Sequence, residues 1–295
     1  MKRLLVLAPI TEGKKVSYTV KRILEEGKKK FSVDTADISK TVLRVKGDGT
    51  PEIKCGKLDL SKYDYVIPRI DSPRASYGYN IISFLDSIGM KKPYSAKTVI
   101  IGHNKFMTLV ALRKAGVRVP DTVMVSSVKV ARTVLEAFKY PLLIKLVTSF
   151  GGEGVFYISS RESAESVIKT LQLMNIQMII EEFVPNAGED IRGFVVGNRV
   201  IASMKRVAKE GEYRANVHLG GKAAPFELTK EMDEICVKAA EATGAKICAI
   251  DMLQDKTTGK PYVIEVNTNP GIQGIEAATG KNIAKEIIDF AYSEC

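Results

Sequence analysis

Two carboxylates and an amide lie near the carboxyl end of the chain at a spacing that suits a metal site. Asp251 follows the apolar run ICAI, and Glu265 and Asn267 alternate with Val266 in VIEVN. A turn centred near Thr258 would place Asp251 opposite Glu265 on a strand pair. Asn267 would share the face of Glu265, because residues two apart on a strand point the same way. Oxygen ligands suit Mg²⁺, and adjacent carboxylates repel without a cation, so we predict a magnesium site over a purely structural pair.

A lysine inside an apolar strand precedes a glycine-rich loop. Lys145 lies in PLLIKLV, where an unpaired ammonium is costly, so it needs an anionic partner. Gly151, Gly152 and Gly154 in SFGGEGV let backbone N–H groups approach an anion. The combination favours ATP phosphates, covered from a β-hairpin because the GK[ST] of a Walker A loop is missing. The alternative is a surface lysine before a simple hairpin.

The segment EEFVPNAGEDIRG runs from a strand into a polar turn. Phe183 and the backbone groups beside it can hold an adenine edge, and Asp190 can accept hydrogen bonds from ribose hydroxyls. Glu182 belongs to the same segment. A solvated acidic turn is the alternative.

Basic residues are dense in MKRVAKEGEYRANVH, which lies between the segment EEFVPNAGEDIRG and the pair of strands that carry Asp251 and Glu265. Arginine forks match phosphate and carboxylate oxygens, so Arg192, Arg206 and Arg214 are candidates for electrostatic catalysis, against surface ion pairing. Asn216 lies close to Arg214. Further on, NPGIQGIE supplies a glycine-containing turn that can hold the reacting carboxylate of an acceptor, or serve as a simple loop.

Composition narrows the function classes. The formal charge of +10 favours an acidic partner such as nucleotide phosphates, a polyanionic acceptor or nucleic acid, against a merely basic surface. Two histidines make zinc hydrolysis improbable, and four separated cysteines argue against a zinc ribbon or a disulfide framework. The first residues read as a strand rather than a signal peptide, and no apolar run approaches a membrane span. We therefore expect a cytoplasmic protein without a membrane partner.

We expect the elements that position these residues to form three parts, each with its own core, because a chain of 295 residues is longer than a usual single domain. Residues 1–94 show a βαβ rhythm, with helices expected at 16–29 and 79–90, and lack a GxGxxG turn. Residues 95–184 follow a linker, KKPYSAK, with a helix capped by Asn104 and ended near Gly116, then an α+β unit with a helix expected at 161–173. Residues 185–295 carry mostly antiparallel strands, a helix at 229–241 and the hairpin ending in VIEVN.

Longer motifs carry a family resemblance over roughly residues 95–291. The strings SFGGEGV, DIRGFVVG, RVAKEGEYRANVHLGG, AIDML and EVNTNPGIQGIE occur in the order and spacing of RimK-type ATP-grasp ligases, the ATP-dependent alpha-L-glutamate ligases, which this chain resembles. The resemblance implies an ATP-grasp fold, of α/β and α+β class, preceded by a parallel-sheet pre-ATP-grasp lobe. It implies ATP phosphates at Lys105 and Lys145, adenine at Glu182 and Phe183, ribose at Asp190, phosphates and metal at Arg214 and Asn216, and two Mg²⁺ ions, with Mn²⁺ as a substitute, at Asp251, Glu265 and Asn267.

The resemblance also implies the reaction. Such enzymes activate a terminal glutamyl carboxylate with ATP, and the amino group of L-glutamate then displaces phosphate to form an amide. The acceptor would be a glutamyl-tailed cofactor or a protein C-terminus, and a homo-oligomer is compatible with the family. Three alternatives stay open: an amino-acid ligase acting on an acidic carrier protein, a kinase on the same fold, and a non-catalytic nucleic-acid or ribosome-binding protein. The last is motivated by the pI near 9.3 but lacks a helix-turn-helix or an RNP-like pattern.

Overall fold

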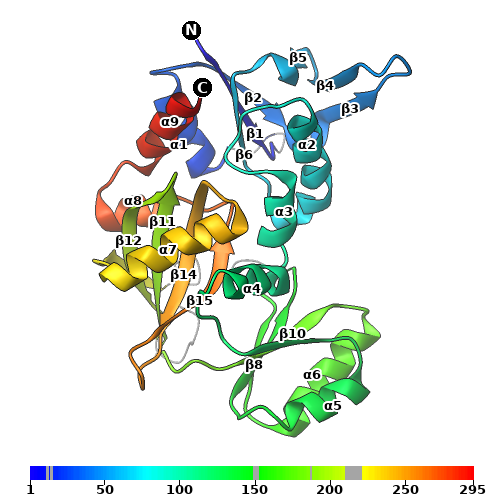
Figure 1. Cartoon of the computed structure of the whole chain (residues 1–295), viewed down its shortest axis with the longest axis vertical. Coiled ribbons are helices and arrows are strands. Elements are labelled where there is room, and N and C mark those ends of the chain that lie inside the picture. Colours follow the sequence, from blue (N-terminus) through cyan, green and yellow to red (C-terminus); the bar gives the residue numbers. More distant parts are fainter. Residues whose placement is uncertain (11–12, 14–15, 149–152, 187, 210–220) are drawn as a thin grey trace.

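The computed structural model describes residues 1–10, 13, 16–148, 153–186, 188–209 and 221–295. Gly151, Gly152, Arg214 and Asn216 therefore lie outside the described residues. The elements gather into an N-terminal sheet, a sheet from the middle of the sequence, called here the central sheet, and a C-terminal sheet. Along the long axis of the molecule, the C-terminal sheet lies between the other two (Figure 1). No helix in the described ranges is long and apolar enough to cross a membrane.

The N-terminal sheet is parallel, as its βαβ rhythm predicts. Its strand order is β2-β1-β6, and β1 is buried on both faces, which explains its uninterrupted apolar sequence. A three-stranded antiparallel sheet, β3-β4-β5, accompanies it and was not expected. The elements are β1 (Arg3–Ala8), α1 (Tyr18–Gly27), β2 (Ser32–Asp37), β3 (Thr41–Val45), β4 (Pro51–Cys55), β5 (Leu58–Asp59), β6 (Tyr65–Pro68) and α2 (Ala75–Ser87).

Two short helices lead into the central sheet. The expected linker is partly wrong, because α3 (Ala96–Gly102) begins inside it, where Asp86 accepts a hydrogen bond from the backbone of Ala96 at 2.8 Å. The expected helix after Asn104 is confirmed as α4 (Lys105–Lys114). The side chain of Asn104 caps it by accepting from the N–H of Met107 at 3.0 Å.

The central sheet has the order β7-β10-β8-β9 and is antiparallel throughout. Helices α5 and α6 pack on one face through apolar residues such as Ala131 and Ile168. The expected helix from residue 161 to residue 173 is confirmed at both ends. The elements are β7 (Thr122–Val125), α5 (Val128–Leu135), β8 (Leu142–Leu146), β9 (Val155–Ile158), α6 (Arg161–Leu173) and β10 (Met178–Glu182).

The C-terminal sheet has the order β13-β12-β11-β14-β15 and is also antiparallel, as expected. Helices α7 and α4 cover one face, while α8 and α9 pack against the other together with β1 and α1. The elements are β11 (Glu189–Val196), β12 (Arg199–Val207), β13 (Lys222–Pro225), α7 (Lys230–Thr243), β14 (Ile247–Gln254), β15 (Pro261–Asn267), α8 (Gln273–Thr279) and α9 (Ile283–Glu294).

One core joins parts that are far apart in the sequence. Leu4 and Val6 of β1 and Val20 of α1 pack in the same cluster as Ile283 and Ile287 of α9. The red and blue helices lie side by side in Figure 1. The proposed boundaries at residues 94 and 184 divide the chain by sequence. In space, the core beside β1 and α1 also contains residues of the last helix, α9.

Candidate active site

The β14–β15 hairpin brings the expected carboxylates together. Asp251 pairs with Glu265, and Ala249 pairs with Asn267, so the expected register is confirmed. Val266 points into the core under α7, and Glu265 and Asn267 therefore lie on the other face of this edge strand.

Asp251 lies between two arginines. The Nε and Nη2 atoms of Arg192 donate to its two carboxylate oxygens, each at 2.6 Å, and Nη2 of Arg206 lies 3.1 Å from Oδ2. Burial alone would raise the pKa of Asp251, but the two guanidinium charges outweigh it and hold that pKa at about 2. The carboxylate therefore stays ionised, with lone pairs left on Oδ1 for a further ligand.

Arg206 is buried and contacts two carboxylates, those of Asp190 and Asp251. Its side chain donates to both oxygens of Asp190, at 2.5 and 2.8 Å, besides contacting Asp251. Burial alone would lower the pKa of Arg206, yet the two carboxylates raise it above its ordinary value. Asp190 is 7% exposed, so the alternative of a solvated acidic turn is wrong for this residue. Its contact with ribose stays a prediction.

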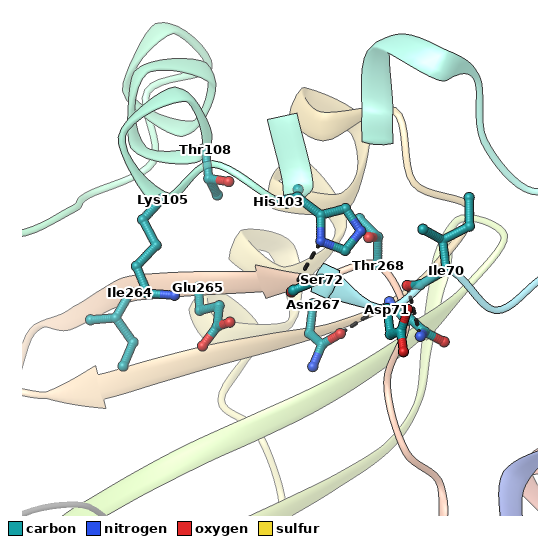
Figure 2. A pocket seen from close by; sticks show the side chains of 12 residues that line it. Ile70, Asp71, Ser72, His103, Lys105, Thr108, Ile264, Glu265, Asn267 and Thr268 are labelled. Carbon is teal, nitrogen blue, oxygen red and sulfur yellow. Dashed lines mark hydrogen bonds between the residues drawn. The ribbon is translucent and has the colours of Figure 1, made fainter. Parts of the chain in front are cut away.

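A pocket of about 200 Å³ opens beside β15. Figure 2 shows Lys105 extending from the start of α4 toward Glu265, with Asn267 next along the strand. The backbone N–H of Lys105 donates to the carbonyl of Val147 at 3.0 Å, which ties the start of α4 to the central sheet. A cation and two oxygen ligands thus converge from elements distant in the sequence.

The other end of this pocket holds residues that sequence reasoning missed. Ser72 and His103 share a hydrogen bond at 3.3 Å between Oγ and Nδ1, and Asp71 lies beside them (Figure 2). Burial lowers the pKa of His103, against a smaller opposing effect of Asp71, so the imidazole is neutral at pH 7. No short motif marks these residues; they meet because the loop after β6 folds against the α3–α4 junction.

Lys145 has the anionic partner that its burial demands. It is 8% exposed and forms an ion pair with Glu181, which extends from the neighbouring strand β10. The partner is a protein carboxylate, so a contact of Lys145 with ATP phosphates stays a prediction. Gly154 follows in the loop before β9 with φ of +67°, and a Cβ there would lie 2.6 Å from Cγ of Leu146, which explains the need for glycine.

The expected adenine residues lie at the end of strand β10, where Glu182 is its last residue and Phe183 follows it. The Oε1 atom of Glu182 accepts from the backbone N–H of Asp121 at 2.9 Å, and Glu182 also lines a pocket of about 640 Å³ together with Phe106. Phe183 meets Tyr157 edge to face, with ring centroids 5.4 Å apart. The nucleotide role of Glu182 and Phe183 stays a prediction.

Two residues of the N-terminal part, Arg69 after β6 and Thr19 in α1, hold the loop that follows β15. The Nη2 atom of Arg69 donates to the carbonyl of Pro270 at 2.8 Å, and the backbone N–H of Ile272 donates to Oγ1 of Thr19 at 3.1 Å. Burial lowers the pKa of Arg69 to about 10, against a smaller opposing effect of Tyr94. These bonds hold the residues between β15 and α8, and with them the end of β15 that carries Asn267. The expected turn NPGIQGIE is partly wrong, because helix α8 begins inside it at Gln273.

The donor set fits magnesium. In the described part of the chain, no three His, Cys, Asp or Glu side chains form a metal-ligating group by themselves. Asp251, Glu265 and the amide of Asn267 together offer three hard oxygen ligands on neighbouring strands, the kind that Mg²⁺ and Mn²⁺ take. Sulfur and imidazole ligands, which zinc favours, are absent from this described set.

Two family models cover almost the whole chain. Residues 6–99 match the RimK PreATP-grasp domain, and residues 102–291 match the RimK-like ATP-grasp domain. A "probable alpha-L-glutamate ligase" of Vibrio parahaemolyticus is 35% identical over 276 residues, which are 92% of this chain and 91% of that protein.

Solved structures show the same fold at lower identity. The ATP-grasp ligase PsnB, complexed with a minimal precursor, Mg and ADP, aligns with a TM-score of 0.75 at 15% identity, covering 99% of this chain and 96% of PsnB. The D-alanine–D-alanine ligase of Bacillus anthracis, complexed with ATP, aligns with a TM-score of 0.73 at 17% identity, covering 100% and 97%.

Proposed function

This chain belongs to the RimK-like ATP-grasp family and is an ATP-dependent ligase, and from that premise we propose that it joins a carboxyl group of an acidic acceptor to the amino group of L-glutamate. The carboxyl group is first activated as an acyl phosphate, and the amine then displaces phosphate. The observation that carries the proposal is the convergence of Lys105, Glu265 and Asn267 in one pocket. A lysine and oxygen ligands for a divalent cation are what a reacting triphosphate needs on its two sides.

The proposed nucleotide site follows from the same geometry. ATP-grasp ligases bind ATP with Mg²⁺, which neutralises phosphate charge; Asp251, Glu265 and Asn267 are the proposed ligands, for two Mg²⁺ ions or for Mn²⁺. Lys105 and Lys145 would hold the phosphates, Glu182 and Phe183 the adenine.

The arginines divide into two roles in this proposal. Arg192 is partly exposed, with 14% of its side chain accessible, and can contact a phosphate or an acyl oxygen from the sheet face. Arg206 is 3% exposed, and its guanidinium is engaged with Asp190 and Asp251, so it acts by positioning those carboxylates. Arg214 and Asn216 complete the phosphate site in the family resemblance.

The acceptor carboxylate would lie at the turn NPGIQGIE. That segment begins two residues beyond Asn267, and its first residues are held by Arg69 and Thr19, so a carboxylate there would lie close to the transferred phosphate. The positive net charge of +10 supports an acidic acceptor, a glutamyl-tailed cofactor or a protein C-terminus. The four cysteines are free thiols in the structure, which supports a cytoplasmic location.

Mass spectrometry of acceptors incubated with the protein, ATP, Mg²⁺ and isotope-labelled L-glutamate tests the proposal. The expected product is an acceptor heavier by one or more glutamyl residues, formed with release of ADP. Addition of hydroxylamine in place of glutamate should yield a hydroxamate of the same acceptor, which reports the acyl phosphate. A phosphorylated acceptor as the final product, with no amide, would show a kinase instead.

A further inference from the structure

The net positive charge of the chain is concentrated in its N-terminal part. Residues 1–94 carry 19 Lys and Arg against 11 Asp and Glu, a net charge of +8. Residues 95–295 carry 25 Lys and Arg against 23 Asp and Glu, a net charge of +2. The part of the chain that precedes the ATP-grasp domain is therefore the part that attracts an acidic partner.

The sheet β3-β4-β5 belongs to this basic part, and β3 is its outer strand. Figure 1 shows the β3–β4 hairpin projecting from the N-terminal sheet. On one face, the cations of Arg44, Lys46 and Lys54 all approach the carboxylate of Glu52, with Asp59 of β5 opposite Lys54. Three cations thus share two carboxylates on this charged face.

The other face of this sheet is apolar and becomes more exposed toward β3. Ile53 of β4 is fully buried, and its partner on β3, Leu43, is half-buried. Val45, two residues further along β3, is 84% exposed. The apolar row therefore continues to the edge of the sheet, where it meets solvent.

Alternate residues of β3 turn their backbone groups toward β4. The N–H of Lys46 donates to the carbonyl of Thr50 at 3.4 Å, so these two residues form a hydrogen-bonded pair. Such pairs alternate along an antiparallel ladder, and Arg44 is therefore the next residue that bonds to β4. Val45, between them, does not, and its partner Pro51 has no N–H to offer.

The residues between these pairs point their N–H and C=O groups to the open side of β3. The carbonyl of Thr41 accepts from Oη of Tyr77 at 2.5 Å, as an outward group can. Within the described residues, Leu43 and Val45 make no backbone hydrogen bond outside the sheet. Proteins normally cover or block such an edge, because it can add a strand from another chain.

A polypeptide suits this edge better than the other possible occupants. Its backbone can pair with the open groups of β3, whereas a nucleic acid has no matching ladder of N–H and C=O groups. A second copy of this chain would bring two basic surfaces together, which like charges oppose. An extended acidic segment has both the backbone and the charge.

Strand β3 begins beside the pocket that holds Glu265. Nε of Arg74 donates to Oγ of Ser39, two residues before β3, at 3.3 Å. The same guanidinium pairs with Asp71, which lines that pocket. Because β3 runs outward from this point, a segment added antiparallel to it runs back toward the pocket. The carboxyl end of the segment is then the end that arrives there.

We propose that the open edge of β3 is the docking site for an extended acidic segment of the acceptor, which joins the sheet β3-β4-β5 as a further antiparallel strand. Its acidic side chains lie beside Arg44 on the charged face, and its alternate apolar side chains cover Leu43 and Val45 on the other. The proposal rests on the proposed function and specifies the acceptor as a protein C-terminus with acidic residues before it.

Fluorescence anisotropy of a labelled peptide tests the edge without catalysis. The probe is a short fluorescein-labelled peptide of alternating glutamate and valine that ends in glutamate. Val45→Pro removes an outward N–H and places a ring on the open side, where proline is tolerated in an edge strand. We expect Kd for the peptide to rise at least about 10-fold, with a wild-type thermal midpoint. Val45→Thr keeps the N–H and is the matched control, with Kd within about twofold of wild type.

Four results would overturn the docking site. The first is an equal Kd for wild type and Val45→Pro, and the second is equal binding of a peptide with lysine in place of glutamate. The third is a wild-type dimer, measured by light scattering, that Val45→Pro dissociates, because a second copy would then occupy the edge. The fourth is binding of single-stranded RNA with no binding of the peptide.

Turnover separates the docking site from the proposed function. Wild type should have a lower KM for the longer peptide than for a dipeptide ending in glutamate, which is too short to occupy the pocket and β3 together. Val45→Pro should remove that advantage. A wild-type protein that binds the peptide through β3 but forms no product with either acceptor would support the docking site and remove the proposed function.

Discussion

Glu265 is the one proposed metal ligand that carries a carboxylate into the pocket beside Lys105. It lies on the edge strand β15 and faces the pocket rather than the core, so Glu265→Gln removes a charged ligand without opening a cavity. We expect turnover to fall by about 100-fold or more, with an unchanged thermal midpoint. Glu286→Gln, which changes a surface partner of Arg199, is the control and should keep wild-type turnover. Wild-type activity in Glu265→Gln would remove this residue from the proposed metal site.

Asp251 makes stability depend on pH in a definite direction. Its pKa in the folded protein, about 2, lies below its ordinary value of 3.8. The folded state therefore binds fewer protons, so the contribution of Asp251 to stability is present above pH 4 or so and is lost as the pH falls toward about 2. The contribution amounts to about 2 kcal/mol.

Urea unfolding of wild type and Asp251→Asn at several pH values measures this contribution. Between about pH 5 and about pH 2.5, wild type should lose roughly 1.5 kcal/mol more of its free energy of unfolding than the variant does, since the variant cannot titrate at this position. Parallel pH curves for the two proteins would contradict the effect assigned to Arg192 and Arg206.

The sequence predicts the part of the candidate site that lies within a single hairpin, β14–β15. Asp251 and Glu265 are equally distant from the turn near Thr258, so counting residues finds this pair. The pairs nearer the turn are shifted by one residue, because a β-bulge between Asp251 and Met252 interrupts the register. The pairs that cross between other elements could not be found this way. Arg192 meets Asp251 because β11 lies beside β14, and 50 residues separate the two strands. The contact of Ser72 with His103 joins the loop after β6 to the α3–α4 junction, and no residue pattern predicts it.

At the scale of elements, the cap of α4 connects stability to nucleotide binding. Asn104 caps the helix, and the next residue, Lys105, faces the pocket. Asn104→Ala should cost about 1 kcal/mol of stability and also raise KM for ATP several-fold, because the first turn that positions Lys105 would fray.

Ser127→Ala provides the comparison for Asn104→Ala. Ser127 caps α5 by accepting from the N–H of Val130 at 3.3 Å, in a helix that does not line the pocket. Its loss should cost a similar amount of stability, about 1 kcal/mol, without a change in KM for ATP. Equal effects of the two substitutions on KM would show that general destabilisation, rather than the position of Lys105, is responsible.

Elements with strong local signals could be predicted from sequence, and those that depend on tertiary contacts could not. Helix α6 has both a Ser160 cap and apolar periodicity, and its expected bounds are confirmed. Helix α3 has seven residues and no side-chain cap of its own, and it is held by Asp86 of the preceding helix. Its sequence alone therefore resembled a linker. The sheet β3-β4-β5 and the helices α8 and α9 were likewise missed.

At the scale of the molecule, the end of helix α3 touches the end of the C-terminal sheet at Gly102. A Cβ added there would lie 2.6 Å from Cγ2 and 2.9 Å from Oγ1 of Thr268, a buried neighbour of Asn267. Gly102→Ala should therefore displace the end of β15, costing about 1–3 kcal/mol of stability and lowering kcat.

The double variant Gly102→Ala/Thr268→Ala tests that explanation, because it removes both atoms that clash. Stability and kcat should recover in part relative to Gly102→Ala. Gly47→Ala, where the added Cβ meets nothing within 4 Å, should change neither quantity. An activity loss that persists without its stability loss would point to a cause other than this contact.

The shared core of β1 and α9 also affects how the protein is made. Leu4 and Val6 leave the ribosome early, whereas Ile283 and Ile287, which cover them, are translated some 280 residues later. Until then the nascent chain presents one apolar side of its first sheet without its final cover. The N-terminal sheet therefore gains its final cover only after α9 is translated, and chaperone binding during synthesis should concentrate on residues 3–8 and 18–27.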